Sequence, residues 1–291
     1  TSDRVTVEDL LRGIIVLSGN DACVVLAEAL SPDGTEKGFA DLMTRRAKKM
    51  GMLNSVFANS NGWPHPEHKM SVKDLAILAN RIVADFPDYY KMFAEETFEF
   101  DGRAAANTRN RNPLLGLGIG ADGLKTGHTS EAGYGLVGSA LQGERRVIFV
   151  ITGLRSQSVR ADEAEAIVNW AFRQFTEKKY GRKNDVIGLA PVWNGASPQV
   201  GLALAEDLNL LVPVFDGDDI NFNAELKTPI TAPLSKGAAI GNLIISRPNL
   251  PTFKVPLVAA ENIGLGGFKE KVLSAANFIL RSINQSQEAA F

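Results

Sequence analysis

The chain has 291 residues, of which 45% are hydrophobic and 22% charged, a composition that excludes an intrinsically disordered protein. Its formal net charge of −2, without any basic block, argues against a nucleic-acid partner. The single cysteine, Cys23, excludes a disulfide within the chain, and its apolar surroundings favour a small buried side chain over a reactive thiol.

The beginning of the chain has an unusual pattern. No signal peptide is visible, and no apolar run approaches the roughly 20 residues that a membrane span requires. The sequence starts at Thr1 without methionine and passes almost at once into a periodic helix over residues 7–15. We therefore expect that a segment upstream of Thr1 has been removed and that the first domain is incomplete.

Helical and strand patterns alternate as far as Arg182. Apolar spacing predicts a helix over 36–50 and another that starts at Ser71, with Ser71 as its N-cap and Asp74 as a capping-box partner. Further along the chain, the pattern predicts strands over 96–100, 134–141 and 146–152 and a helix over 162–175. This order predicts an α/β (α+β) domain in which helices flank an antiparallel sheet.

The pattern changes after residue 182. Short strands, such as 208–214 and 239–245, alternate with Pro and Gly and predict a small all-β domain. An apolar stripe from Phe268 to Ile283 then returns to helical spacing, with lysines and an arginine elsewhere around the helix. The sequence thus predicts three parts, at residues 1–182, 183–261 and 262–291, the last an amphipathic helix and tail.

Two short motifs carry candidate chemistry. Ser18-Gly19-Asn20 precedes an apolar helix, and taken alone these residues are explained as a helix cap. Lys125-Thr126-Gly127 precedes a predicted strand, and taken alone it is explained as a surface turn; a phosphate loop is excluded because Leu124 stands where glycine is needed. Together, Ser-x-Asn and a distant Lys-Thr-Gly form the pairing found in penicillin-binding proteins and serine β-lactamases.

The residue types suit a substrate that ends in a carboxylate. Lys125 and Thr126 can supply a fixed cation and a hydroxyl on a strand edge, and Gly127 lets a substrate backbone lie close. The N–H of His128 can serve as an oxyanion donor. Arg155 can pair with a carboxylate through a bidentate fork, although an ordinary surface arginine explains it equally well.

Longer stretches carry a resemblance to one family. RGIIVLSGNDACVVLAE, FANSNGWPHPEHKMSVKDLAILA, DGLKTGHTSEAGYGLVGSA and RADEAEAIVNWAFRQF resemble the D-alanyl-D-alanine carboxypeptidases, the low-molecular-mass penicillin-binding proteins. ITAPLSKGAAIGNLII and VPLVAAENIGLGG resemble that family's β-rich C-terminal domain. The resemblance implies a penicillin-binding/serine β-lactamase-like fold and an exported bacterial protein on the periplasmic face of the cytoplasmic membrane, held there by its C-terminal helix.

The resemblance also implies a mechanism. The terminal D-Ala of a peptidoglycan stem peptide would be removed through an acyl-enzyme, and β-lactams would bind as substrate mimics. Ser18 would relay a proton to the leaving amine, and Asn20 would hold the substrate amide. No cofactor or metal is implied. His65-Pro66-Glu67-His68 has a metal-like composition, but it lacks the His-Glu-x-x-His spacing, and Pro64 and Pro66 exclude the helix that a zinc motif requires.

One departure from the family pattern concerns the nucleophile. The family acylates a serine in a Ser-x-x-Lys motif upstream of Ser-x-Asn, and no serine here has lysine three residues later. Thr176-Glu177-Lys178-Lys179 has the spacing, but we expect it near the end of a helix and it follows Lys-Thr-Gly. We therefore expect the nucleophile on an upstream fragment, and an inactive chain without it.

Two other functions stay open at this point. A serine β-lactamase fits less well, because Gly19 stands where class A enzymes have aspartate and because of the additional β-domain. A peptidoglycan-binding protein without catalysis fits the missing Ser-x-x-Lys.

Overall fold

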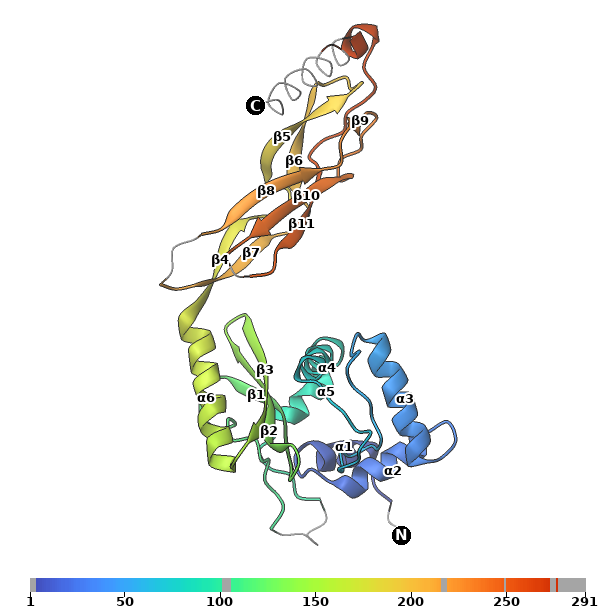
Figure 1. Ribbon diagram of the computed structural model, residues 1–291, viewed down its shortest axis with the longest axis vertical. Coiled ribbons are helices and arrows are strands. Elements are labelled where there is room, and N and C mark those ends of the chain that lie inside the picture. Colours follow the sequence, from blue (N-terminus) through green and yellow to red (C-terminus); the bar gives the residue numbers. More distant parts are fainter. Residues whose placement is uncertain (1–3, 101–105, 216–218, 249, 273–275, 277–291) are drawn as a thin grey trace. The chain divides into compact units, whose positions relative to one another are not determined.

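The structure is a computed structural model that describes residues 4–100, 106–215, 219–248, 250–272 and 276 (Figure 1). The chain forms two compact units, Thr1–Arg173 and Gln174–Phe291. The sequence placed this boundary later, after Arg182. The boundary lies earlier because β4 (Phe175–Gly181) pairs with β7 (Leu208–Pro213) and so belongs to the second unit.

The first unit is a three-stranded antiparallel sheet between helices, as the sequence predicted (Figure 1). Its elements in chain order are α1 (Val7–Ile15), α2 (Asn20–Leu30), α3 (Glu36–Lys49), α4 (Val72–Asp85), α5 (Pro87–Tyr90), the 3₁₀ helix η1 (Lys91–Ala94), β1 (Ala121–Thr129), β2 (Gly133–Gln142), β3 (Arg145–Leu154) and α6 (Gln157–Gln174). The strands lie in the order β1-β2-β3.

Apolar side chains cover both faces of this sheet. On one face, Leu136 and Ala140 of β2 pack against Ala164 and Val168 of α6. On the other face, Leu124 of β1 packs in a second cluster whose members are Ala79, Tyr90, Ile82, Val83, Phe93, Val137 and Ile148. The sheet is therefore held from both sides, and β1 lies at its edge among the described strands.

Two local predictions for the first unit are wrong: the strand over 96–100 and the capping box at Asp74. Residues 96–100 do not form a strand, since only Thr97 makes an isolated bridge, with Arg109. Ser71 caps α4 as predicted, by accepting from the Asp74 N–H at 3.1 Å.

Asp74, however, does not complete a capping box. Its buried carboxylate accepts from Asn54 N at 2.8 Å and from Ser55 Oγ at 2.7 Å, and Ser55 Oγ in turn accepts from Ser71 N at 3.2 Å. Asp74 therefore anchors the preceding loop to α4, a tertiary role that its spacing from Ser71 does not reveal.

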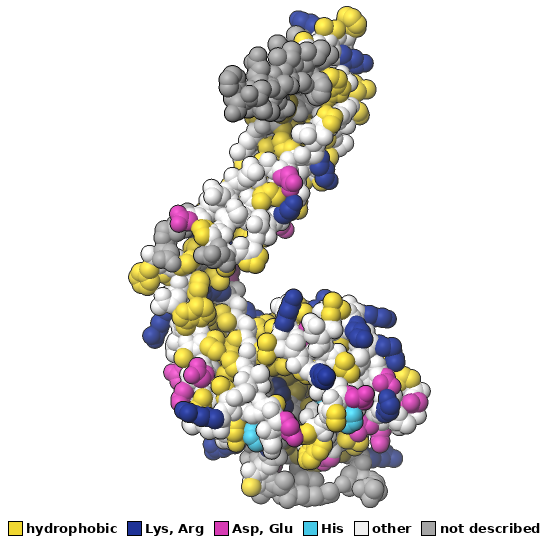
Figure 2. Space-filling view, in the orientation of Figure 1, with side chains coloured by type: hydrophobic (Ala, Val, Ile, Leu, Met, Phe, Trp, Pro, Cys, Tyr) yellow, Lys and Arg dark blue, Asp and Glu magenta, His cyan; other side chains and the backbone are white. Residues whose placement is uncertain are grey.

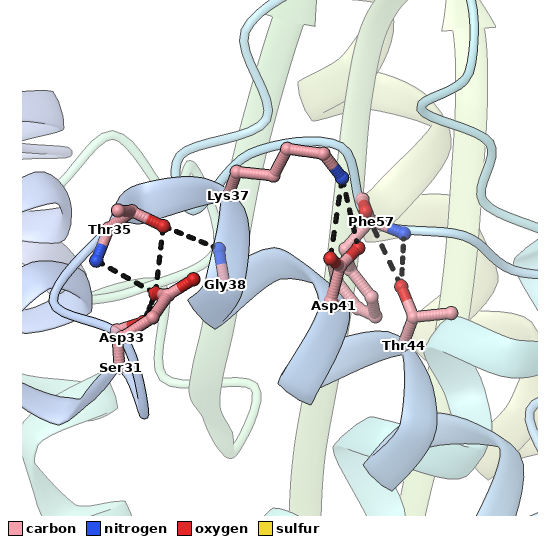
Figure 3. Close-up of polar contacts among 8 residues, drawn as sticks. All are labelled: Ser31, Asp33, Thr35, Lys37, Gly38, Asp41, Thr44 and Phe57. Atoms are coloured by element: carbon pink, nitrogen blue, oxygen red, sulfur yellow. Dashed lines mark hydrogen bonds and ion pairs between the residues drawn. The ribbon is translucent and has the colours of Figure 1, made fainter.

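The connection from α2 to α3 is fixed by local hydrogen bonds (Figure 3). One oxygen of Asp33 accepts from Ser31 Oγ, from Thr35 N and from Thr35 Oγ1, and these bonds lower the pKa of Asp33 to about 2. Thr35 accepts from Gly38 N at 2.9 Å and so caps α3. Further along α3, Thr44 Oγ1 accepts from Phe57 N at 3.0 Å.

The second unit is β-rich, as predicted. Its strands are β4, β5 (Val186–Trp193), β6 (Gln199–Leu204), β7, β8 (Asn221–Leu226), β9 (Ile230–Thr231), β10 (Ala239–Ser246) and β11 (Phe253–Ala259). Six strands form one sheet in the order β8-β10-β11-β6-β5-β9, and β4 and β7 form a two-stranded sheet. Thr176 lies in β4, just after α6 ends at Gln174, so it is near a helix end as expected.

The predicted tail helix stays a prediction. Residues 268–272 are helical, and the Phe268 side chain is 86% exposed. Most of the stripe that ends at Ile283 lies outside the described residues. Within the described ranges, every helix is too short or too polar to cross a lipid bilayer.

Candidate active site

The Ser18 elbow is not a conventional helix cap. The N-cap of α2 is Gly19, and no side chain caps this helix end. Ser18 has φ +58°, a left-handed conformation that is unusual for a residue other than glycine and that often occurs at functional sites. The Gly19 N–H donates to Gly13 O at 2.9 Å, which ties the elbow to α1. The Ser18 hydroxyl is therefore left available for another partner.

That partner is Lys125. Lys125 Nζ donates to Ser18 Oγ and also to the carbonyl of Thr126 at 2.9 Å, although 107 residues separate Ser18 from Lys125. The contact joins the elbow before α2 to the edge strand β1 of the sheet. The fold thus brings together one side chain from each of the two motifs.

The surroundings of Lys125 favour its neutral form. Burial is the main cause that lowers the pKa of Lys125 to about 8, and the positive charges of Arg111 and Arg160 act in the same direction. The Cys23 thiol acts in the opposite direction and raises the pKa. A lysine in this range exchanges its proton near neutral pH, as a proton relay requires.

The other motif residues line the exposed end of β1. A Cβ atom at Gly127 would meet no atom within 4 Å, so the backbone is open to a neighbour at this point. His128 is exposed, and its ring lies 3.9 Å from that of Tyr134, measured between centroids. Asn20 is exposed at the first turn of α2. The roles of Asn20, Thr126, Gly127 and His128 toward a substrate stay predictions.

Sequence reasoning missed Arg160. This side chain is only 5% exposed, and its Nη2 donates to the carbonyl of Arg111 at 3.2 Å. Its guanidinium lies 5.9 Å from the centroid of the Tyr134 ring, and burial lowers its pKa. Arg160 Nε is buried and has no hydrogen-bond partner among the described residues. A signal existed, because Arg160 is four residues before Ala164, on the buried face of α6.

Arg155 is placed differently. It is exposed in the bend between β3 and α6, and its side chain makes no ion pair with another residue in the described part of the chain. Its assignment to a substrate carboxylate stays a prediction.

Arg111 and Asn107 border the elbow and were also missed. Arg111 Nη2 donates to Asn107 Oδ1 at 3.1 Å, and Asn107 Nδ2 donates to the carbonyl of Leu17 at 3.4 Å. These bonds connect the residues just before β1 to the residue that precedes Ser18. Both lie in an irregular segment, so no periodic pattern marks them.

The remaining candidates lie apart from this chemistry. His68 packs edge-on against Phe57 and accepts from Ala58 N at 3.4 Å, and burial lowers its pKa. Cys23 is half-buried, and burial raises the pKa of its thiol. Among the described residues, no group of three or more His, Cys, Asp or Glu side chains could hold a metal ion.

The sheet between helices, with Ser-x-Asn facing Lys-Thr-Gly, defines a domain of the penicillin-binding, serine D,D-peptidase class. The sequence model of D-alanyl-D-alanine carboxypeptidase matches residues 1–156, and that of the C-terminal domain of penicillin-binding protein 5 matches residues 175–264. The chain belongs to the D-alanyl-D-alanine carboxypeptidase family.

Individual relatives agree with this assignment. D-alanyl-D-alanine carboxypeptidase DacC of Escherichia coli is 33% identical over 97% of this chain and 69% of the relative. Penicillin binding protein 5 of Haemophilus influenzae has a TM-score of 0.76 at 32% identity, over 90% of this chain and 76% of that one. Penicillin-binding protein D2 of Listeria monocytogenes, solved in its ampicillin-bound form, has a TM-score of 0.53 at 31% identity, over 59% and 70%.

Proposed function

We propose that this chain forms the substrate-binding and proton-relay part of a serine-type D-alanyl-D-alanine carboxypeptidase that trims peptidoglycan stem peptides. The observation that carries the proposal is the contact between Lys125 Nζ and Ser18 Oγ, in a setting that lowers the pKa of the lysine to about 8. A hydroxyl held by a lysine that releases its proton near neutral pH can pass a proton to a leaving amine.

The proposed reaction has two steps. The oxygen of a nucleophilic serine attacks the carbonyl carbon of the D-Ala-D-Ala bond, the C–N bond breaks, and the amine of the departing D-Ala takes a proton through Ser18. Water then attacks the acyl-enzyme ester, which releases the shortened peptide and restores the serine. Lys125 holds Ser18 in place and supplies the proton path.

Three features of the site support a peptide substrate that ends in a carboxylate. The edge of β1 is open at Gly127, so a substrate backbone can add there as a further strand. Asn20 would hold the substrate amide. Arg160, with its unpartnered Nε, is a stronger candidate than Arg155 for the carboxylate, together with the hydroxyl of Thr126.

The acylating serine is the part that residues 1–291 do not supply by motif. No serine in the sequence has lysine three residues later, and the chain spans 69% of the Escherichia coli relative. We place the Ser-x-x-Lys pair outside residues 1–291 and expect these residues alone to form no acyl-enzyme. The same fact favours the second candidate function, a peptidoglycan-binding protein without catalysis.

The proposal extends to β-lactams and to location. A penicillin would acylate the same serine, as a mimic of the D-Ala-D-Ala terminus. We propose that the protein lies on the periplasmic face of the cytoplasmic membrane, with the helix that begins at Phe268 against the lipid surface. Co-sedimentation with liposomes, with and without residues 262–291, tests that location, and equal partitioning would refute it.

The central experiment is labelling with a fluorescent penicillin. Residues 1–291 should take up no covalent label, whereas a polypeptide that adds a Ser-x-x-Lys segment at the N-terminus should be labelled and should cleave D-Ala-D-Ala peptides. In the longer polypeptide, Lys125→Ala should reduce kcat/KM at least ~100-fold, consistent with loss of a general acid–base path. Lys37→Ala is the control, since Lys37 is an exposed lysine paired with Asp41.

Each alternative has its own result. Stoichiometric labelling of residues 1–291 would place the nucleophile inside this chain. No labelling of the longer polypeptide, together with retained binding to peptidoglycan, would favour the non-catalytic function.

A further inference from the structure

The strand that carries Lys125 contains one extra residue. Ala121 of β1 lies opposite Ala140 of β2, but Gly123 lies opposite Ser139, so two steps along β1 match one step along β2. The extra residue is Asp122. Such a β-bulge locally interrupts the ladder and changes the direction in which the following side chains point.

The bulge decides which residue of β2 lies opposite Lys125. Ala121 and Thr126 both lie opposite residues whose side chains pack on the α6 face, namely Ala140 and Leu136. Thr126 is five positions after Ala121, whereas Leu136 is four positions before Ala140. Without the bulge, Lys125, and not Thr126, would lie opposite Leu136. With the bulge, Lys125 lies opposite Val137, which packs on the α4 face.

Asp122 is clamped by side chains from two other elements. Tyr90 Oη donates to Asp122 Oδ1 at 2.9 Å, and Arg146 of β3 approaches both carboxylate oxygens at 2.8 Å. Arg146 Nη1 also donates to the buried Ser139 Oγ at 2.5 Å and lies over the Tyr90 ring. The bidentate pair is directional, so it holds Asp122 in one orientation.

The next residue is held as well. Asn112, which is 5% exposed, donates from Nδ2 to the carbonyl of Gly123 at 2.9 Å. A Cβ atom at Gly123 would lie 2.7 Å from Tyr90 Oη, so only glycine allows this close approach. The bulge is therefore fixed from α5, from β3 and from the segment before β1.

We propose that Asp122, held by Arg146 and Tyr90, is a positioning residue that presents Lys125 to Ser18. Ion pairs in partly buried positions contribute little net stability compared with apolar packing, but they can specify register. The ion pair holds Asp122, the extra residue that shifts the pairing of β1 with β2, and so fixes the register of the following residues. The inference rests on the proposed role of Lys125, and it assigns no contact with substrate to Asp122.

The test measures the protonation of Lys125 and needs no catalysis. Trace acetylation of residues 1–291 with acetic anhydride across pH 6–11, followed by mass spectrometry, gives the pH at which each lysine becomes reactive. In the unaltered chain Lys125 should show a midpoint near pH 8, set by burial, Arg111, Arg160 and Cys23. In Asp122→Asn the midpoint should rise toward the ordinary lysine value of about 10.4, as Lys125 leaves this setting.

A matched control separates positioning from general stability. Glu95→Gln breaks the Arg12–Glu95 pair, whose side chains are 27% and 31% exposed, close to the 22% and 25% of Arg146 and Asp122. This control should leave the Lys125 midpoint near pH 8 even if it lowers Tm as much as Asp122→Asn does.

If Asp122→Asn does not fold, the same acetylation midpoint is measured in Arg146→Gln, which removes the other partner of the ion pair. An unchanged Lys125 midpoint in a folded clamp variant would overturn the inference. Because the readout is chemical reactivity, this result stands whether or not the longer polypeptide proves to be a carboxypeptidase.

Discussion

Replacing Lys125 by methionine should raise stability at neutral pH, and the gain should disappear at high pH. Burial lowers the pKa of Lys125 from 10.5 to about 8. At about 1.4 kcal/mol for each pH unit, this corresponds to an unfavourable free energy of about 3 kcal/mol for the charged form in the folded chain. Methionine has a similar length and no charge, so it removes this cost.

The pH dependence follows from the proton balance. Between pH 8 and 10.5 the unfolded chain keeps a proton on Lys125 that the folded chain has released, so the free energy of unfolding rises with pH across this window. The methionine variant has no such term. The difference in unfolding free energy between variant and parent should therefore shrink between pH 7 and pH 10, by at most about 3 kcal/mol and less if solvent reaches the ammonium.

Urea unfolding of residues 1–291 at pH 7 and pH 10 measures this difference, with Lys37→Met as the exposed control. At pH 10 the remaining difference in unfolding free energy reports the loss of the hydrogen bonds from Lys125 to Ser18 Oγ and to the Thr126 carbonyl. A difference that stays constant between the two pH values would refute the assigned burial of Lys125. A difference that grows with pH would mean that the pKa of Lys125 is raised in the folded chain, and not lowered.

Three further predictions test the scaffold. Asp74→Ala should lower the free energy of unfolding by about 2–4 kcal/mol, because Asn54 N and Ser55 Oγ lose a buried acceptor. Urea unfolding measures this loss against Asp41→Ala, and an equal effect of the two variants would contradict the prediction. NMR titration should give Asp33 a pKa of about 2, and Ser31→Ala should raise it by removing the main cause of the lowering; an unchanged value would contradict the assigned bond. Gly138→Ala should cost about 1–3 kcal/mol in thermal unfolding, because its Cβ would lie 2.3 Å from the Phe149 ring, whereas Gly264→Ala meets open space and should be nearly neutral.

Much of the fold was predictable because periodicity reports burial directly. The α3 and α4 helices, the hairpin of β2 and β3, and the β-rich second unit all follow from apolar spacing and turn residues. The boundary after Arg182 was wrong because the polar run in β4 has no apolar alternation, and only its pairing with β7 makes it a strand. The sequence pattern within residues 175–181 gives no information about β7.

The site was predictable where it consists of motifs and not where it depends on tertiary contacts. Ser18 and Lys125 were identified from short patterns, and the fold joins them. Arg160 was missed because the predicted helix began at Asp162, whereas α6 begins at Gln157 and carries Arg160 on its buried face. Asp122 was missed because a bulge is a property of two strands, and its partners come from α5 and β3.

The electrostatics of the site connect its stability to its proposed ligand. Lys125 carries a lowered pKa, and the positive charges of Arg111 and Arg160 contribute to that lowering. In the described part of the chain, no ion pair joins any of these three side chains to a carboxylate, and Arg160 Nε has no hydrogen-bond partner. The folded chain therefore holds positive charge together without compensation, which is unfavourable until an anion arrives. A peptide carboxylate that meets Arg160 and the Thr126 hydroxyl would relieve this repulsion and raise the pKa of Lys125. In the proposed mechanism, substrate binding would then load the lysine with the proton that Ser18 passes to the departing amine.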